Sequence, residues 1–323
     1  MIRTQLLDPS RSLPLLVELE RENGAASNSN ALLPWYRENE AFVERKLLEH
    51  GAILFRGFGV KTPGTFARIT RAVSPALLDG KEENVPRTKL TSGVYTSTEY
   101  PAEYMLSMHS EYSYSNHWPA RLFFCCIVAA REGGETPIAD NREILESLDP
   151  GIVDQFQCKK VMYLRNLHDG QGFGLSWQTA FQTTDKKTVE TYCRESSIEF
   201  CWTGTGLRLS QALNAIITHP KTGQRVWFNQ APQFHPSDYP PEIYRSLLDA
   251  YKQESELPQN VCFGDGTPMD ATVLGTIRET MRKKAVLFRW QEGDLLLLDN
   301  VLVSHGRMPF SGARKILVAM SEN

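Results

Sequence analysis

The chain has 323 residues, of which 41% are hydrophobic and 23% charged, and its formal net charge is −3. This balance is ordinary for a globular protein and excludes a disordered chain. It also lacks the surplus of basic residues that indicates binding to nucleic acid or to an anionic membrane. The length is compatible with one large domain.

The cysteines and the N-terminus favour a cytoplasmic protein. Six cysteines are scattered without a CxxC pair, and Cys125 and Cys126 are adjacent inside an apolar run. Reduced thiols are therefore favoured over disulfides. Charged residues and a proline at 8–11 interrupt the N-terminus before a signal-peptide core develops, and the longest apolar stretch, 122–130, is too short for a membrane span.

In the first half of the chain, the pattern predicts one helix between short β-rich runs. Asn, Ser and Ala at 22–30 indicate a polar loop. Apolar residues spaced among charges predict a helix over 38–50 that stops at the following glycine. The run 52–58 reads as a short strand, and β-branched and aromatic residues predict a buried strand over 121–130.

In the second half, strands dominate and turns are rich in Gly, Pro, Asn and Asp. Helices are expected over 239–253 and 271–284, and strands over 295–299 and 314–320. This order does not alternate as βα units do. It predicts an antiparallel β-core with helices packed outside it.

A candidate metal site begins at His109 and Glu111. In an extended segment, residues two apart point to the same face, so an imidazole and a carboxylate can aim at one ion. The HxE pattern alone arises often by chance, and a partly exposed pair at a strand edge is the alternative. His305, which follows the strand predicted over 295–299, supplies a third ligand from a distant segment.

Two histidines and one carboxylate are the donor set of non-haem Fe(II) oxygenases, because they leave adjacent coordination positions open. A closed structural zinc site needs a fourth ligand, and no cysteine here is suitably spaced. Arg314 starts the next strand, where its planar fork can bind a carboxylate bidentately, although a surface arginine is the alternative. Thr136, in a GGET turn, is placed to donate to the same carboxylate.

These residues occur in the order of a known family. The segments are His109-Ser110-Glu111, Gly133-Gly134-Glu135-Thr136, Trp227-Phe228-Asn229-Gln230, Phe263-Gly264-Asp265-Gly266 and His305-Gly306-Arg307 through Arg314. The chain resembles the TauD/TfdA family of iron(II)/2-oxoglutarate-dependent dioxygenases, and within it the clavaminate-synthase-like and SyrP-like branch. The resemblance covers roughly residues 52–320.

The resemblance implies one domain over 1–323, with an N-terminal extension at 1–35 and a double-stranded β-helix, or jelly-roll, core at 36–323. It implies that His109, Glu111 and His305 bind Fe(II), and that Arg314 binds 2-oxoglutarate with Thr136 as its helper. Many relatives carry Asp where this chain has Glu111. Related halogenases lack this carboxylate, so Glu111 argues against halogenation.

Five further residues are candidates for contact with the substrate. Arg165 and Asn166 end a strand before a glycine-rich segment, 168–174, that could act as a lid; a charged loop anchor is the alternative. Asn229 and Gln230 follow an apolar strand and either enter the barrel mouth or shape a turn. Arg121 heads a buried strand and binds either a substrate anion or a neighbouring carboxylate.

The function that follows is hydroxylation of an unactivated C–H bond in an amino acid or an amino-acid derivative, free or tethered to a carrier protein. 2-Oxoglutarate is decarboxylated to succinate and CO2 while O2 is consumed. The alternatives are desaturation, epoxidation or cyclisation by the same oxidant. A non-catalytic jelly-roll that binds a small carboxylate and a zinc hydrolase are less consistent with Thr136 and Arg314. The sequence does not indicate an oligomeric state.

Overall fold

Eight strands form the largest sheet of this computed structural model, which describes residues 1–20, 31–78, 87–97 and 100–322. Their order is β1 (Ile2–Leu6), β2 (Leu15–Leu19), β3 (Ala52–Arg56), β16 (Leu295–Asp299), β7 (Arg121–Val128), β19 (Lys315–Ser321), β5 (Val94–Thr96) and β4 (Lys89–Thr91). Neighbours in this sheet are antiparallel, apart from the parallel pair β2 and β3.

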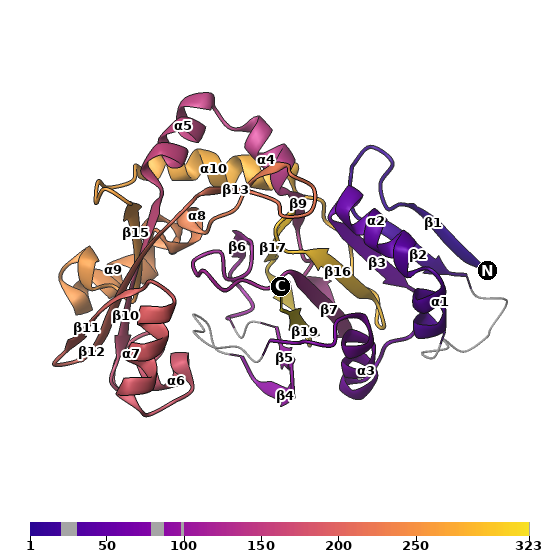
Figure 1. The fold of residues 1–323 in the computed structure, drawn as a ribbon, viewed down its shortest axis with the longest axis horizontal. Coiled ribbons are helices and arrows are strands. Elements are labelled where there is room, and N and C mark those ends of the chain that lie inside the picture. The colour runs from indigo at the N-terminus through magenta and orange to yellow at the C-terminus, as the bar shows by residue number, and fades with distance from the viewer. Residues whose placement is uncertain (21–30, 79–86, 98–99, 323) are drawn as a thin grey trace.

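The central strands β16 and β7 are buried on both faces, which explains their nearly continuous apolar sequences, whereas the edge strands β1 and β4 are largely exposed. Along β7, Leu122 and Phe124 pack into the interior core, whereas Phe123 and Cys125 pack into a second core on the other face. Helices α1 (Leu32–Glu38), α2 (Glu40–His50) and α3 (Pro63–Val73) contribute to that second core and cover the outer face (Figure 1).

A smaller sheet faces the interior side of the large one. It contains β6 (Leu106–His109), β17 (Val303–Arg307) and β9 (Ile138–Asp140), in that order. The ring of Phe124 on β7 lies 5.1 Å from that of His305 on β17, so the two sheets meet around this histidine. They form the double-stranded β-helix core that was expected. The short strands β8 (Glu132–Gly133) and β18 (Phe310–Ser311) pair at its rim.

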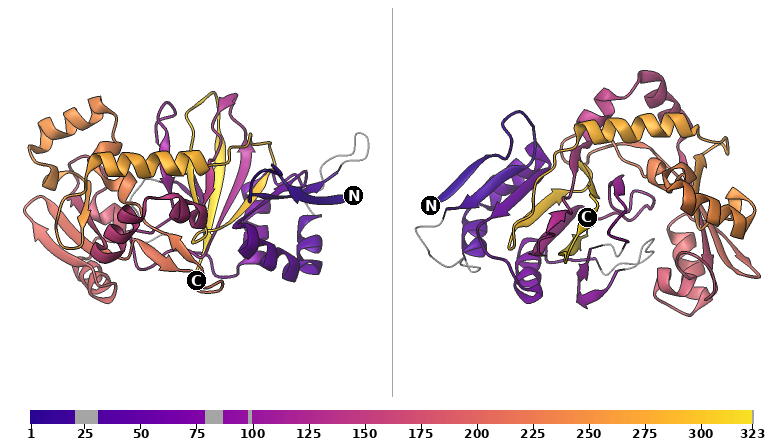
Figure 2. Two further views of the ribbon diagram at one scale, coloured as in Figure 1. Left: turned by 90° about the horizontal axis from the view of Figure 1, so that it is seen from above. Right: turned by 180° about the vertical axis from the view of Figure 1, so that it is seen from behind.

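A second group of elements lies on the side of the molecule opposite the N-terminal strands (Figures 1 and 2). Its sheet has the order β11 (Glu199–Thr203), β12 (Gly206–Leu213), β10 (Val161–His168) and β15 (Gln259–Phe263). Helices α6 (Trp177–Phe181), α7 (Lys186–Glu195) and α9 (Pro241–Tyr251) accompany it, and α4 (Asn141–Ser147), α5 (Pro150–Lys159) and α10 (Ala271–Lys284) bridge it to the jelly-roll. The strands β13 (Ile216–Thr218) and β14 (Arg225–Trp227) and the helical turns α8 (Ala231–Phe234), η1 (Pro236–Asp238) and η2 (Glu254–Glu256) complete this group.

Most predicted elements are confirmed, with shifts of one to three residues at their ends. The helix over 271–284 and the strand over 295–299 have the bounds that were predicted. The helix predicted over 38–50 is α2, which begins two residues later, after a break at Asn39 that separates it from α1. It stops as expected at Gly51, whose φ is +71° and where a Cβ would lie only 2.5 Å from Val303 Cγ2.

The polar loop expected over 22–30 lies outside the described residues. Across the described ranges, we find no helix with the length and hydropathy needed to span a bilayer. No disulfide joins the six cysteines, all of which lie in described segments.

Candidate metal centre and substrate cavity

Two histidines from distant segments face each other across paired strands. His109 ends β6, His305 lies at the centre of β17, and the two residues are partners in the antiparallel register. Their ring centroids are 4.5 Å apart, and both residues are buried. The fold therefore brings the two predicted histidines directly together.

Glu111 joins them from a turn rather than from a strand. The expected extended segment ends at His109, and the chain then turns through Tyr112, whose φ is +55°. The prediction of a shared strand face is thus wrong for the backbone, but the side chains converge all the same. Glu111 Oε2 lies 3.8 Å from His109 Nε2 and 3.7 Å from His305 Nε2. Donor atoms of all three lie within 4.8 Å of one another.

The backbone of Glu111 is held by Asn300, which is fully buried directly after β16. The Oδ1 atom of Asn300 accepts a hydrogen bond of 2.7 Å from the Glu111 N–H. Its Nδ2 donates to the carbonyl oxygens of Glu111 and Pro119, each at 2.9 Å. One side chain thus satisfies three buried backbone groups and fixes the turn that carries the carboxylate.

A second buried asparagine, Asn141, ties the two ligand-bearing segments together. Its Nδ2 donates to Ser110 Oγ at 3.0 Å, and its Oδ1 accepts from Ser304 Oγ. Ser110 separates His109 from Glu111, and Ser304 precedes His305. The network therefore spans both sides of the cluster.

Sequence reasoning missed the roles of Asn141 and Asn300. Both are the second residue of an Asp-Asn pair at the end of a strand, after Asp140 of β9 and Asp299 of β16. That repeated pair was the available signal, but the partners of the two amides depend on which strands the fold brings together.

The protonation of the cluster suits a metal ion. His109 Nδ1 donates to the Ser107 carbonyl at 2.9 Å, which leaves the lone pair of Nε2 facing the other two ligands. Burial lowers the pKa of His305 to about 3, so its imidazole is neutral. Burial opposes the charge of Glu111, but the neighbouring Arg87 guanidinium outweighs it and places the pKa of Glu111 far below its usual range. Two imidazoles and one carboxylate fit Fe(II).

Arg87 is a functional candidate that the sequence did not reveal. Its Nη2 lies 2.9 Å from Glu111 Oε1, and both side chains are more than nine-tenths buried. The two carboxylate oxygens therefore have separate neighbours, because Oε1 faces Arg87 while Oε2 faces the histidines. Arg87 leaves only Oε2 oriented toward a metal.

Thr136 and Arg314 line a small cavity that also touches the His109, Glu111 and His305 cluster. Arg314 Nε donates to the Gly134 carbonyl at 3.0 Å, and burial lowers the pKa of Arg314 to about 10. The Thr136 hydroxyl accepts from Trp290 Nε1 at 3.1 Å, so its own hydrogen is directed elsewhere. The structure thus brings together all five residues predicted for iron and 2-oxoglutarate.

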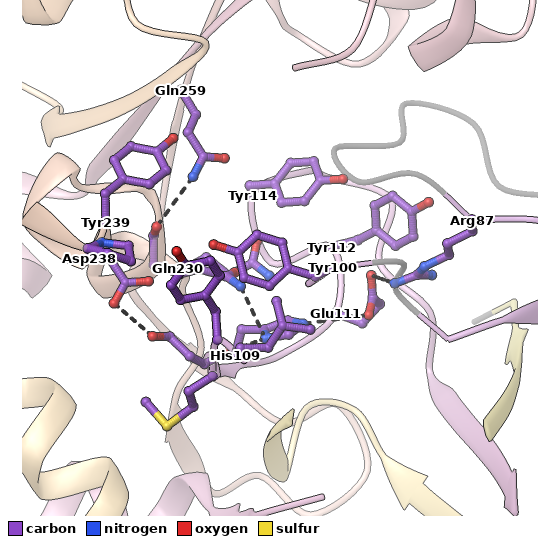
Figure 3. A pocket seen from close by; sticks show the side chains of 16 residues that line it. Arg87, Tyr100, His109, Glu111, Tyr112, Tyr114, Gln230, Asp238, Tyr239 and Gln259 are labelled. Atoms are coloured by element: carbon purple, nitrogen blue, oxygen red, sulfur yellow. Dashed lines mark hydrogen bonds and ion pairs between the residues drawn. The ribbon is translucent and has the colours of Figure 1, made fainter. Parts of the chain in front are cut away.

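A larger cavity of about 320 Å³ opens on the other side of the cluster (Figure 3). His109 and Glu111 form part of its wall, and tyrosines and glutamines form much of the remainder. This volume is at the small end of the range for ligand pockets in proteins.

Of the residues predicted to contact substrate, Gln230 lines this cavity. Its Oε1 is buried without a hydrogen-bond partner in the described structure. Arg165 is 2% exposed, and its guanidinium lies 5.1 Å from the ring of Tyr114, which lines the cavity. Arg165 therefore stands behind the aromatic wall.

Three other candidates are placed elsewhere. Asn166 points to the opposite face of β10 from Arg165, because neighbours on a strand alternate, and its amide donates to the carbonyls of residues 255 and 257. Asn229 shapes a turn through the Ala215 carbonyl and the Ala231 N–H. Arg121 pairs with Glu44, which is the alternative that the sequence left open.

The segment 168–174 does not appear among the described residues that line the cavity. Its Phe173 N–H donates to the Tyr251 hydroxyl at 3.1 Å, on α9. The role of this segment as a lid stays a prediction.

Comparison with known proteins agrees with this geometry. The model of the family described as "Taurine catabolism dioxygenase TauD, TfdA family" matches residues 19–320. The chain belongs to the TauD/TfdA family. It is therefore an Fe(II)/2-oxoglutarate-dependent dioxygenase, and the resemblance seen in the sequence is confirmed.

Individual relatives of this TauD/TfdA protein cover most of its length. The dapdiamide synthesis protein DdaC of Enterobacter agglomerans is 40% identical over 296 residues, which are 91% of this chain and 89% of DdaC. A clavaminate synthase-like protein of Arabidopsis thaliana is 28% identical over 292 residues, which are 86% of this chain and 84% of the relative. The crystal structure of PvcB from Pseudomonas aeruginosa shares the fold with a TM-score of 0.54 at 14% identity, over 100% of this chain and 91% of PvcB.

Proposed function

We propose that this dioxygenase hydroxylates an unactivated C–H bond of an amino acid or an amino-acid derivative in specialised metabolism. The observation that carries the proposal is the cluster of His109, Glu111 and His305 in the walls of two cavities, one beside Arg314 and one open to a small molecule. The 40% identity to a protein of dapdiamide synthesis supports a biosynthetic role.

In this proposal the chain holds its cofactor and cosubstrate through five residues. His109, His305 and Oε2 of Glu111 bind Fe(II), and Arg314 with Thr136 binds the carboxylate of 2-oxoglutarate remote from the metal. When bound, Fe(II) supplies the activation of O2, for which 2-oxoglutarate provides two electrons. Arg314 is well suited because burial makes a charged, bidentate contact with a carboxylate stronger than it is in water.

The protein's own contribution is orientation and exclusion of water. Asn141 and Asn300 hold the ligand-bearing backbone in place before any metal binds. The tyrosine wall of the larger cavity surrounds the reacting C–H bond with aromatic rings, and Phe124 lines the smaller cavity beside His305. This limits attack of the oxidant on water or on the protein itself.

The reaction that follows hydrogen abstraction from the substrate determines the product. Hydroxylation adds one oxygen atom to the substrate, whereas desaturation and cyclisation remove two hydrogens. Epoxidation of an alkene also adds one oxygen, so it is distinguished from hydroxylation by NMR of the product. Glu111 occupies the carboxylate position, which supports oxygenation rather than halogenation.

The test is a screen of amino acids, their amides and their carrier-bound thioesters with Fe(II), 2-oxoglutarate and O2, read as succinate release and product mass. We expect substrate-dependent succinate, lost in His109→Ala and in Glu111→Ala. Glu279→Ala, at an exposed carboxylate of α10 that pairs with Lys283 and lines neither cavity, is the matched control. Full activity in either ligand variant contradicts the proposal. If the enzyme accepts a carrier-bound thioester but not the free amino acid, a carrier protein delivers the substrate.

The site of action proposed is the cytoplasm. The absence of disulfides among the six cysteines and the need to keep iron as Fe(II) support a reducing compartment. Fractionation of the native host with detection of the protein by antibody checks this assignment.

A further inference from the structure

The wall of the larger cavity carries a carboxylate that the iron chemistry does not use. Asp238 ends the helical turn η1 and lines the cavity together with His109 (Figure 3). Its Oδ1 accepts a hydrogen bond of 2.7 Å from Ser107 Oγ, and the carbonyl of the same serine accepts from His109 Nδ1. Asp238 is therefore attached to the strand that presents the proposed iron ligand.

The charge of Asp238 is only partly compensated by the protein. The ion-pair partner found for it is Arg278 of α10, whose Nε lies 3.8 Å from Oδ1, beyond hydrogen-bond distance. The two terminal nitrogens of Arg278 donate instead to the Pro232 carbonyl at 2.6 Å and to Ser237 Oγ at 2.8 Å. Burial raises the pKa of Asp238, and neither Ser107 nor Arg278 cancels that effect. A cation entering the cavity would supply the missing compensation.

The neighbours of Asp238 in the cavity also suit a cation. Tyr100 and Tyr239 line the same wall, and aromatic rings attract ammonium groups (Figure 3). The Tyr100 ring already has one cationic neighbour, Arg307, whose guanidinium carbon lies 5.9 Å from the ring centroid. The buried Oε1 of Gln230 is an acceptor that has no donor within the described structure. In contrast, the other charged lining residues, Arg87 and Glu111, are paired with each other.

We propose that Asp238 is a specificity-determining residue that binds a primary ammonium group of the substrate, with Tyr100 and Tyr239 beside it. This deepens, and rests on, the proposed function, because it names the part of an amino-acid-like substrate that the cavity recognises. Asp238 is joined through Ser107 to the backbone beside His109, so an ammonium bound there places its neighbouring carbons toward the metal side of the cavity. A substrate whose nitrogen is acylated loses its positive charge and two of its three N–H donors.

The test is equilibrium binding rather than turnover. The protein is loaded with Mn(II) and 2-oxoglutarate, and the Kd is measured by calorimetry at pH 7.5 for the standard amino acids, their primary amides, and the N-acetyl counterpart of each. We expect the tightest-binding amine to lose about tenfold or more in affinity on N-acetylation, since a hydrogen-bonded charge pair is removed. In Asp238→Asn the affinity for the amine should fall by a similar factor, while the affinity for the N-acetyl compound should not change.

Asp265→Asn, an exposed carboxylate paired with Lys159, is the matched control and should bind like the wild type. If Asp238→Asn does not fold, Tyr100→Leu is the second variant. Its affinity for the amine should be about threefold lower than that of the wild type, which is within the range of a cation–π contact. The proposal is overturned if no amine of the panel binds, if N-acetylation has no effect, or if both Asp238→Asn and Tyr100→Leu discriminate as the wild type does. Failure of wild-type protein to bind Mn(II) and 2-oxoglutarate overturns the proposed function instead.

Discussion

Replacing Gly134 with alanine should weaken the binding of 2-oxoglutarate without touching a proposed ligand. Gly134 has a φ of +72°, and its carbonyl accepts the hydrogen bond from Arg314 Nε at 3.0 Å. A Cβ at this position would lie 2.9 Å from Ala130 Cβ, 3.0 Å from Arg314 Cδ and 3.1 Å from Arg314 Nε. Non-bonded carbon atoms prefer separations of about 3.5–4.0 Å, so the arginine must move by several tenths of an ångström.

Gly134→Ala should lower both the stability of the protein and its affinity for 2-oxoglutarate, and a control variant separates the two effects. An alanine in the left-handed region costs about 1–2 kcal/mol of stability wherever it occurs. Displacement of Arg314 removes part of a charge-assisted hydrogen bond to the cosubstrate, worth about 1.5 kcal/mol or more, which is about a tenfold rise in Kd. Gly223 has nearly the same φ, +70°, but a Cβ there meets no atom within 4 Å. Gly223→Ala is therefore the control for backbone strain alone.

The assay is an anaerobic titration of the Fe(II)-loaded protein with 2-oxoglutarate, in which calorimetry gives the Kd. The Tm of each variant is measured in parallel. We expect both variants to lower Tm and Gly134→Ala alone to raise the Kd for 2-oxoglutarate. The reasoning is refuted if Gly134→Ala binds 2-oxoglutarate as tightly as the wild type, or if Gly223→Ala weakens binding equally.

Three further predictions follow from the contacts around the cluster. Mn(II) at one hundred times its Kd should stabilise the wild type by about 2.7 kcal/mol in thermal denaturation, and Glu111→Ala should abolish this shift because one of three donors is lost. Asn300→Ala leaves three buried backbone groups unsatisfied and should cost about 2–4 kcal/mol in urea unfolding; a loss below 1 kcal/mol contradicts the positioning role. Arg307 donates to the carbonyls of Tyr100 and Tyr104, which line the substrate cavity, and of Pro101, while its own side chain lines the smaller cavity. Arg307→Met keeps the bulk of the side chain but removes the three hydrogen bonds, so it should raise the KM for the organic substrate at least threefold more than the KM for 2-oxoglutarate. Equal changes in both KM values would show that Arg307 acts on the core as a whole.

The proposed iron-binding cluster could be predicted from the sequence because its donors are chemically distinctive. His109, Glu111 and His305 are few in kind, and their order along the chain matches a family pattern. The core strands could be predicted for a related reason, since a strand buried on both faces is an unbroken apolar run, such as 295–298.

The roles of the residues around the cluster could not be predicted from the sequence in the same way. Arg87 and Asp238 sit in segments with no strong periodicity, and their importance comes from neighbours distant in sequence. For Asn166, the strand was predicted but its register was not, and a shift of one residue decides which face a side chain takes. Charge and polarity in a sequence identify candidates, whereas pairing between distant strands selects among them.

The register that sets His109 opposite His305 has a consequence for how the protein matures. On the proposed ligand set, a chain in which β17 has not yet paired with β6 offers an incoming ion only His109 and Glu111. Full affinity for iron then appears only when the C-terminal strands have docked, and the bound ion in turn opposes their release. Iron loading thus becomes a checkpoint on chain completion, because an unfinished barrel cannot retain the metal from which a damaging oxidant is made.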